Sequence, residues 1–147
     1  MIAIGSDHAG YELKAQLTHY FKDQNIPFQD FGTDGLASVD YPDYGIKVGE
    51  AVATGKYEFG IVICGTGIGI SISANKVKGI RAALIYDENT AKLAKQHNNA
   101  NIIALGGRTH PFELAVKLVE TYRNETFEAR HQKRLDKLTK YEMEHTK

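Results

Sequence analysis

The chain has a single cysteine and no excess of either charge, with 18 Lys and Arg residues against 18 Asp and Glu residues. One cysteine cannot form an internal disulfide, and so low a cysteine content suits a reducing compartment. A formal net charge of zero gives no indication of binding to nucleic acid or to an anionic membrane. The first expectation is therefore an intracellular domain without disulfides, with no nucleic-acid or membrane partner.

Long hydrophobic runs are also missing. No apolar stretch approaches the roughly 20 residues that a membrane-spanning helix requires. The N-terminal segment MIAIGSDHAG has few apolar residues and lacks the basic residues that open a signal peptide. No repeat, low-complexity segment or linker rich in Pro and Ser divides the chain, and its 147 residues suit one domain. We expect a single soluble, cytoplasmic domain over residues 1–147.

Apolar runs alternate along the chain with segments of helical periodicity. Five runs are typical of β-strands and cover residues 1–7, 26–32, 59–64, 79–86 and 101–107. Between and after them, apolar residues recur at the three- and four-residue spacing of amphipathic helices. Strands that alternate with helices predict a parallel sheet with right-handed crossovers and helices on both faces. The expected fold class is α/β, with a five-stranded parallel sheet.

The C-terminal segment, about residues 126–147, differs from the rest. Its apolar residues are few, and six residues of RHQKRLDKLTKYEMEHTK are Lys or Arg. One interpretation is a solvated helix or a frayed terminus. The other is a helical arm that reaches onto a partner subunit, because so thin an apolar stripe buries little surface within its own chain.

The sequence CGTGIG, residues 64–69, falls where a ligand is expected, because open parallel sheets bind ligands outside the carboxyl ends of their strands. Cys64, the only cysteine, directly precedes a turn in which Gly65, Gly67 and Gly69 alternate. Free N–H groups of such a turn can stabilise an oxyanion, and a thiol beside them ionises more readily. The structural alternatives are a tight turn that requires positive φ and a small buried thiol.

Other candidates for ligand binding have equally plain alternatives. His8 opens a helix at the end of the first strand, where an imidazole and amide N–H groups together suit a phosphate. Asp7 suits the N-cap of that helix. His97 and Asn98 end a helix, and the alternative there is a cap or a surface residue.

Three arginines suit a phosphate dianion. Arg130 and Arg134 are spaced i, i+4, which places two guanidinium groups on one helical face, and Arg108 follows the last strand. The alternative is a charged, solvated helix face.

Several catalytic and cofactor motifs are absent. The glycine spacing matches neither the dinucleotide pattern G-x-G-x-x-G nor a Walker A lysine motif, and G-x-S-x-G does not occur. One Cys and scattered His residues lack the paired spacing of a zinc site. We expect no cofactor and no metal. A Cys–His hydrolase stays open, although no papain-like signature surrounds Cys64.

Five segments together carry a resemblance to a known family. GSDHAGYELK, DYPDY, CGTGIGISISANK, KQHNNAN and RHQKR occur in this order over essentially the whole chain. They resemble the ribose-5-phosphate isomerase B family, which also includes galactose-6-phosphate isomerase subunits. The resemblance implies a Rossmann-like three-layer fold and interconversion of ribose 5-phosphate and ribulose 5-phosphate through an enediolate, without cofactor or metal. It also implies a homodimer, or a dimer of dimers, with active sites shared between subunits.

The resemblance assigns roles by position. Cys64 matches the proton-shuttling base and His97 the residue that opens the sugar ring. The catalytic loop that stabilises the anion matches Thr66 with the amides of Gly65, Gly67, Ile68 and Gly69. Sugar contacts match Asp7, Tyr41 and Asn98, and phosphate contacts match His8, Arg108, Arg130 and Arg134. Ile70 stands where a second subgroup has a glutamate base, so the chain resembles the cysteine type.

Besides the Cys–His hydrolase, two other functions remain open from the sequence. The first is the same reaction on a 6-phosphate aldohexose, such as galactose or allose 6-phosphate. The second is a non-catalytic module that binds phosphate or a nucleotide.

Overall fold

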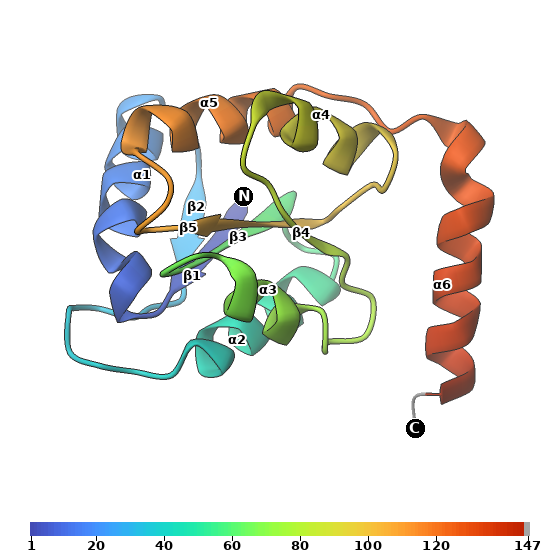
Figure 1. Ribbon diagram of the computed structural model, residues 1–147, viewed down its shortest axis with the longest axis horizontal. Coiled ribbons are helices and arrows are strands. Elements are labelled where there is room, and N and C mark those ends of the chain that lie inside the picture. The colour runs from blue at the N-terminus through green and yellow to red at the C-terminus, as the bar shows by residue number, and fades with distance from the viewer. Residues whose placement is uncertain (146–147) are drawn as a thin grey trace.

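A computed structural model describes residues 1–145 as an α/β domain with a C-terminal helix beside it (Figure 1). Five strands form one parallel sheet in the order β2-β1-β3-β5-β4, which confirms the predicted fold class. The strands are β1 (Ile2–Ser6), β2 (Phe28–Asp30), β3 (Phe59–Cys64), β4 (Ala82–Leu84) and β5 (Ile102–Gly106). The helices are α1 (Tyr11–Asp23), α2 (Tyr41–Ala53), α3 (Ile68–Ala74), α4 (Glu88–Gln96), α5 (Phe112–Arg123) and α6 (Gln132–His145), with short 3-10 turns at His8–Gly10 and Ala129–His131.

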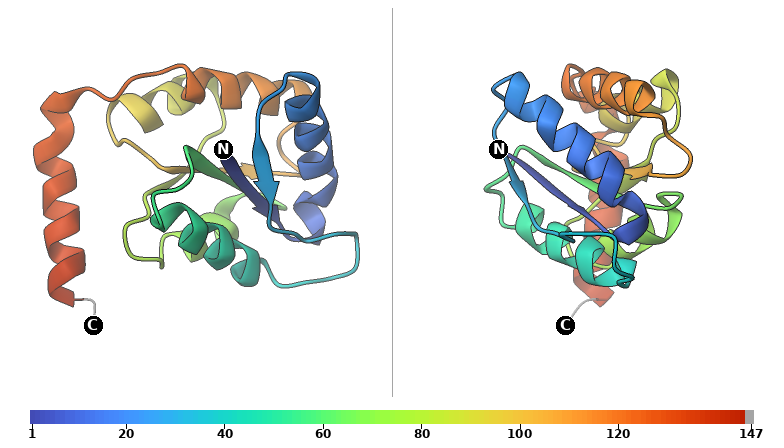
Figure 2. Two further views of the ribbon diagram at one scale, coloured as in Figure 1. Left: turned by 180° about the vertical axis from the view of Figure 1, so that it is seen from behind. Right: turned by 90° about the vertical axis from the view of Figure 1, so that its left-hand side faces the viewer.

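The three central strands are buried on both faces. Every residue of β1, β3 and β5 is buried, as expected of strands covered by helices on either side. Alternate residues point to opposite faces, so that Ile61 and Ile63 join one apolar cluster while Val62 and Cys64 join the other. Helices α1, α4 and α5 cover the first face, and α2 and α3 cover the second (Figure 1; Figure 2, right).

The two edge strands are shorter than the sequence suggests. The apolar runs 26–32 and 79–86 predict strands, yet β2 and β4 hold three residues each. Each edge strand pairs with a neighbour on one side only, so the chain leaves the sheet once that pairing ends. The remaining apolar residues of these runs pack outside the strands; Ile85, for example, is fully buried just after β4.

Helix α6, called the arm below, stands apart from the body of the domain (Figure 1; Figure 2, left). Leu135 at its start is buried, and Glu142 accepts a hydrogen bond from the N–H of Gly79 at 2.8 Å. Further along, Leu138 and Tyr141 are largely exposed, at 58% and 64%. The segment is thus a helix with little burial in its own chain, and its contact with a partner subunit stays a prediction. Residues 146–147 of the predicted segment lie outside the described residues.

A groove of about 740 Å³ separates the arm from the domain. Its walls are the inner side of α6 and the amino ends of β4 and β5, including Ala82, Ala83 and Ala100. Among residues 1–145, no helix has both the length and the apolar content needed to cross a bilayer.

Candidate active site

A small cleft of about 250 Å³ opens at the carboxyl ends of β1 and β3, the edge of the sheet where a ligand is expected. Eight of the predicted site residues line this cleft, from segments that are far apart in the sequence. They are Asp7, His8, Tyr41, Cys64, Gly65, Thr66, Gly69 and Arg108, and the ninth lining residue is Ala9, which the sequence did not single out.

Cys64 ends β3 and faces the glycine turn that follows it. The residue is only 5% exposed, and its Sγ accepts a hydrogen bond from the N–H of Gly67 at 3.2 Å. An amide N–H aimed at sulfur stabilises a thiolate more than a neutral thiol. The sulfur therefore lies in a wall of the cleft, next to an amide N–H that points at it.

Gly67 shows why the turn requires glycine. Its φ is +84°, and a Cβ there would lie 3.0 Å from the carbonyl carbon and oxygen of Leu105 in β5. The turn is thus a tight turn of positive φ, as the structural alternative proposes. The same turn brings the N–H of Gly67 to the sulfur of Cys64. The need for glycine at this position and the hydrogen bond to sulfur therefore arise from one loop.

Two predicted loop amides do not face the cleft. Gly67 and Ile68 are absent from its lining. The N–H of Gly67 donates to Sγ of Cys64, and the N–H of Ile68 donates to Oγ1 of Thr66 at 3.2 Å. These bonds fix the loop and occupy the two donors. The groups left to meet an anion in the cleft come from Gly65, Thr66 and Gly69, whose residues line it.

Glycine also lets two polar side chains approach the loop closely. A Cβ on Gly65 would lie 3.0 Å from Nη1 of Arg108, and a Cβ on Gly69 would lie 2.7 Å from Cζ of Tyr41. Either added carbon would push its neighbour away from the cleft. The guanidinium group and the phenol ring are therefore positioned by the absence of side chains beside them.

Asp7 and His8 are fixed by hydrogen bonds at the end of β1. Oδ1 of Asp7 accepts from the N–H of Gly10 at 3.1 Å, so Asp7 caps the 3-10 turn and lines the cleft as well. Nδ1 of His8 lies 3.2 Å from both the N–H and the carbonyl oxygen of Val39. Backbone groups therefore hold both side chains in place at the edge of the cleft.

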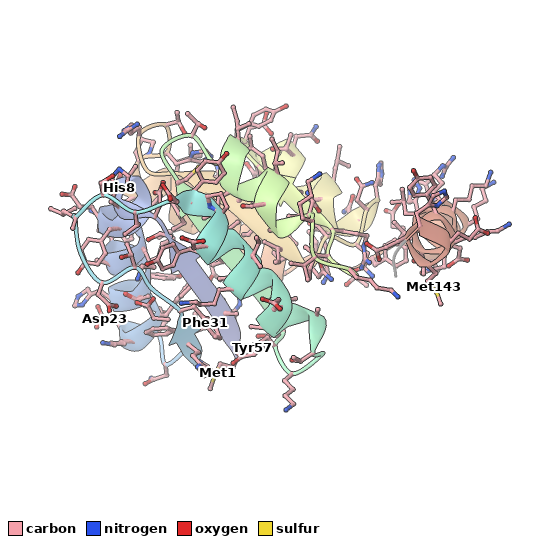
Figure 3. The ribbon with its side chains drawn as sticks, turned by 90° about the horizontal axis from the view of Figure 1, so that it is seen from below. Met1, His8, Asp23, Phe31, Tyr57 and Met143 are labelled. Carbon is pink, nitrogen blue, oxygen red and sulfur yellow. The ribbon has the colours of Figure 1, made fainter. Side chains whose placement is uncertain are left out.

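The other predicted residues lie at the opposite edge of the sheet. His97 and Asn98 follow α4 and precede β5, so they lie beside the amino ends of the strands, and Asn98 lines the groove under the arm. Arg130 and Arg134 lie where the arm begins. In Figure 3, His8 of the cleft and Met143 of the arm lie at opposite ends of the molecule.

Arg130 does not share a helical face with Arg134. The sequence spacing predicts one α-helix through both, but Arg130 falls in the 3-10 turn at Ala129–His131 and α6 begins after it. Arg130 pairs instead with Glu128, with Nη2 to Oε1 at 3.0 Å, and Arg134 donates from Nη1 to Nδ1 of His131 at 2.9 Å. The chain is held here before the arm starts, because the N–H of Glu128 donates to the carbonyl of Gln96 at the end of α4.

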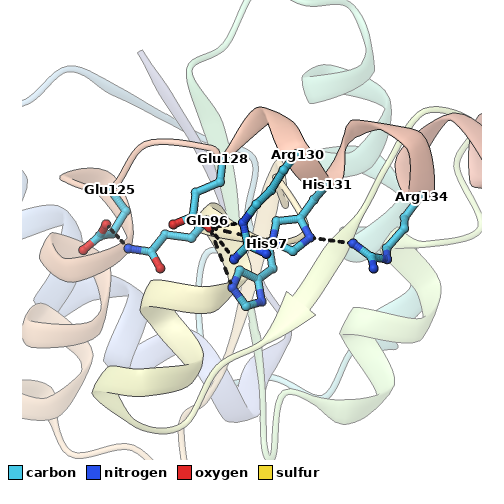
Figure 4. Close-up of polar contacts among 7 residues, drawn as sticks. All are labelled: Gln96, His97, Glu125, Glu128, Arg130, His131 and Arg134. Atoms are coloured by element: carbon cyan, nitrogen blue, oxygen red, sulfur yellow. Dashed lines mark hydrogen bonds and ion pairs between the residues drawn. The ribbon is translucent and has the colours of Figure 1, made fainter.

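A second cluster of polar side chains, beside the start of the arm, contains His97, Arg130 and Arg134 (Figure 4). It also contains two residues that the sequence did not single out, Glu128 and His131. Oε1 of Glu128 lies 4.0 Å from Nε2 of His97 and 3.7 Å from Nε2 of His131. Burial, followed by the positive charge of Arg130, lowers the pKa of His131 below its usual value. The only signal in the sequence is the position of His131 between the two arginines in RHQKR.

The fold is of the α/β type, and the cleft at the carboxyl edge of its sheet gathers acidic, basic and hydroxyl groups beside a thiol. A model of the ribose/galactose isomerase family matches residues 2–138. Ribose-5-phosphate isomerase B of Escherichia coli is 41% identical over 96% of this chain and 95% of its own length.

Two solved structures are also similar to this chain. That of Clostridium thermocellum ribose-5-phosphate isomerase B has 48% identity and a TM-score of 0.96, and covers 99% of both chains. That of the Mycoplasma genitalium enzyme, with bound ribulose-5-phosphate, has 41% identity and a TM-score of 0.92, and covers 97% of this chain and 96% of its own. The chain belongs to the ribose/galactose isomerase family. It is an enzyme of the isomerase class and not a non-catalytic binding module.

Proposed function

We propose that the chain interconverts ribose 5-phosphate and ribulose 5-phosphate, and that Cys64 is the base. This reaction removes a proton from the sugar's C2 and returns it to C1, through an enediolate. A base must lie within hydrogen-bond reach of the carbon, and donors must face the oxygen on which charge develops. The observation that carries the proposal is the position of the Cys64 sulfur in the cleft wall, with the N–H of Gly67 at 3.2 Å.

The glycine loop stabilises the enediolate in this proposal. Thr66 and the backbone of Gly65 and Gly69 line the cleft next to Cys64, so the base and the donors come from one short segment. Removing one such donor typically costs about 10²–10³ in rate. The amide of Gly67 acts on the base instead of the oxyanion, because it is bonded to sulfur.

Phosphate and sugar contacts hold the substrate in register. The imidazole of His8 and the guanidinium of Arg108 line the cleft and bind the phosphate in this proposal, and Asp7 and Tyr41 are available to the hydroxyl groups. The phosphate takes no part in the bonds that change. Its binding energy aligns C1 and C2 with Cys64.

A second copy of the chain completes the site in this proposal. The cleft, at about 250 Å³, is below the range of about 300–1,000 Å³ typical of ligand pockets. Four residues with expected roles, His97, Asn98, Arg130 and Arg134, lie at the far edge of the same chain. A homodimer in which each copy offers this far edge to the other copy's cleft unites them.

Exposed apolar residues support such an interface. Ile68 and Ile72 are spaced i, i+4 on α3, next to the cleft, and are 55% and 56% exposed. The arm presents Leu138, Tyr141 and Met143 at comparable exposure. Apolar surface of this extent on two sides of one domain is typical of a protein that associates with another copy of itself.

Turnover of ribose 5-phosphate, with and without alkylation of the thiol, tests the proposal. The untreated enzyme should convert it and the alkylated enzyme should not, while both bind inorganic phosphate. A hexose 6-phosphate is the second candidate, because the family description names galactose beside ribose. Direct competition of ribose 5-phosphate with galactose 6-phosphate decides between them by the ratio of their kcat/KM values.

A further inference from the structure

Three groups that bind transition metals meet beside the start of the arm, although they come from distant parts of the chain. His97 follows α4, whereas Glu128 and His131 lie beyond α5, in the segment that leads into the arm. Two imidazole nitrogens and one carboxylate oxygen lie within 4.8 Å of one another. We propose that His97, Glu128 and His131 form a binding site for a divalent transition metal ion of the Zn²⁺ class.

The spacing of the three atoms is close to that of a bound metal. Zinc bonds to nitrogen and oxygen of about 2.0–2.2 Å place tetrahedral ligand atoms about 3.3 Å apart. Oε1 of Glu128 lies 4.0 Å from Nε2 of His97 and 3.7 Å from Nε2 of His131. Small rotations of the side chains close these gaps. The two imidazole rings already lie together, with centroids 4.3 Å apart, in the arrangement drawn in Figure 4.

His131 supplies a second, independent observation. Its side chain is 9% exposed, and within the described residues its Nε2 is buried without a hydrogen-bond partner. A buried polar atom without a partner is costly, and a metal ion satisfies it directly.

Arg134 opposes the metal. A guanidinium only donates, so its 2.9 Å contact makes Nδ1 of His131 the acceptor and leaves the ring proton on Nε2. Metal binding at Nε2 moves that proton to Nδ1, and Arg134, which is exposed, must then turn away. Removal of the Arg134 guanidinium should therefore strengthen metal binding.

The ligand atoms indicate which ions bind, and the presence of His97 among them indicates what binding does to the enzyme. Two imidazoles and one carboxylate suit Zn²⁺, Co²⁺ or Ni²⁺, whereas Mg²⁺ and Ca²⁺ prefer sites made of oxygen atoms. The ion occupies Nε2 of His97. Reversible inhibition of the isomerase follows, and this part of the inference rests on the proposed function, in which His97 opens the sugar ring. Metal binding itself does not depend on that role.

Cobalt absorption reports the binding directly. Co²⁺ is titrated into the Cys64→Ser variant, so that no thiolate contributes, and the expected result is one Co²⁺ per chain with the visible bands of a four- or five-coordinate site. Glu128→Gln and His131→Ala, each added to that variant, should weaken binding by at least about 10- to 100-fold, the loss seen for outer-shell partners alone. Glu128 is half-exposed, so its variant remains informative if His131→Ala does not fold.

His19→Ala is the matched control. His19 lies 3.3 Å from Asp23 on the exposed face of α1, and this pair of possible ligands is the rival site. Loss of His19 should leave the cobalt spectrum unchanged. Arg134→Gln should bind Co²⁺ more tightly. Zn²⁺ should inhibit turnover by the unmodified enzyme, with recovery on chelation, and Mg²⁺ should not. The inference is overturned if no such spectrum forms, if it survives Glu128→Gln, or if it disappears in His19→Ala; a spectrum without inhibition overturns the inhibitory role.

Discussion

Gly67→Ala is a direct test of the turn that follows Cys64. The φ of Gly67 is +84°, where L-residues are strained. A Cβ at this position would lie 2.7 Å from Cδ1 of Leu84 and 3.0 Å from the backbone carbonyl of Leu105. The leucine side chain can move, but the carbonyl belongs to the central strand β5 and is held by the sheet.

The expected loss of stability combines two effects. The left-handed backbone costs about 1–2 kcal/mol for an L-residue. Forcing a methyl group into a packed region costs about 1–3 kcal/mol more. The free energy of unfolding should therefore fall by about 2–5 kcal/mol, a large part of the roughly 5–15 kcal/mol that holds a typical domain folded.

Gly55→Ala is the matched control, because it has nearly the same φ without the crowding. The φ of Gly55 is +80°, and no heavy atom lies within 4 Å of the position that a methyl group would take there. This variant should lose only the backbone part, about 1–2 kcal/mol. Urea denaturation of both variants measures the difference at the midpoint. Equal losses would refute the close approach of the turn to β5, and with it the geometry that aims the Gly67 amide at sulfur.

Three further predictions concern the second cluster and the shared site. Arg130→Ala and Arg134→Ala should each raise KM with little change in kcat, because in the proposed shared site these residues hold only the phosphate; a fall in kcat alone would contradict this. Mixing Cys64→Ala with His97→Ala subunits should restore about a quarter of wild-type activity, because half of the random dimers are hybrids with one intact site of two; no recovery would argue against a site built from both copies. The lowered pKa of His131 means that the unfolded chain binds its proton more readily, so stability should fall as pH drops through about 6.5, the ordinary histidine value. The His131→Gln variant should lose less stability over that pH range, as followed by thermal unfolding.

The strands of the sheet show where sequence patterns suffice. The runs at β1, β3 and β5 are continuous and apolar because these strands are covered on both faces, so they could be read directly from the sequence. The edge strands β2 and β4 could not be delimited in this way, because apolar residues such as Ile85 stay buried after the ladder has ended.

The candidate site also has one part that the sequence predicts and one part that it does not. Cys64, Asp7 and Arg108 meet because parallel strands end at one edge, a rule that needs no knowledge of side-chain packing. The contact of His97 with Glu128 and His131 depends on how the segment before the arm folds back on α4, through Glu128 N–H to the Gln96 carbonyl at 2.9 Å. No local spacing encodes that contact, so neither Glu128 nor a metal could be expected there from the sequence.

Proton exchange at C2 of ribose 5-phosphate in deuterated water tests the central claim most directly. If the Cys64 sulfur takes the C2 proton, the enzyme should introduce solvent deuterium into the sugar, and Cys64→Ala should abolish this exchange while the protein stays folded and binds phosphate. Exchange at a near-normal rate in Cys64→Ala would show that another group is the base, and would contradict the account.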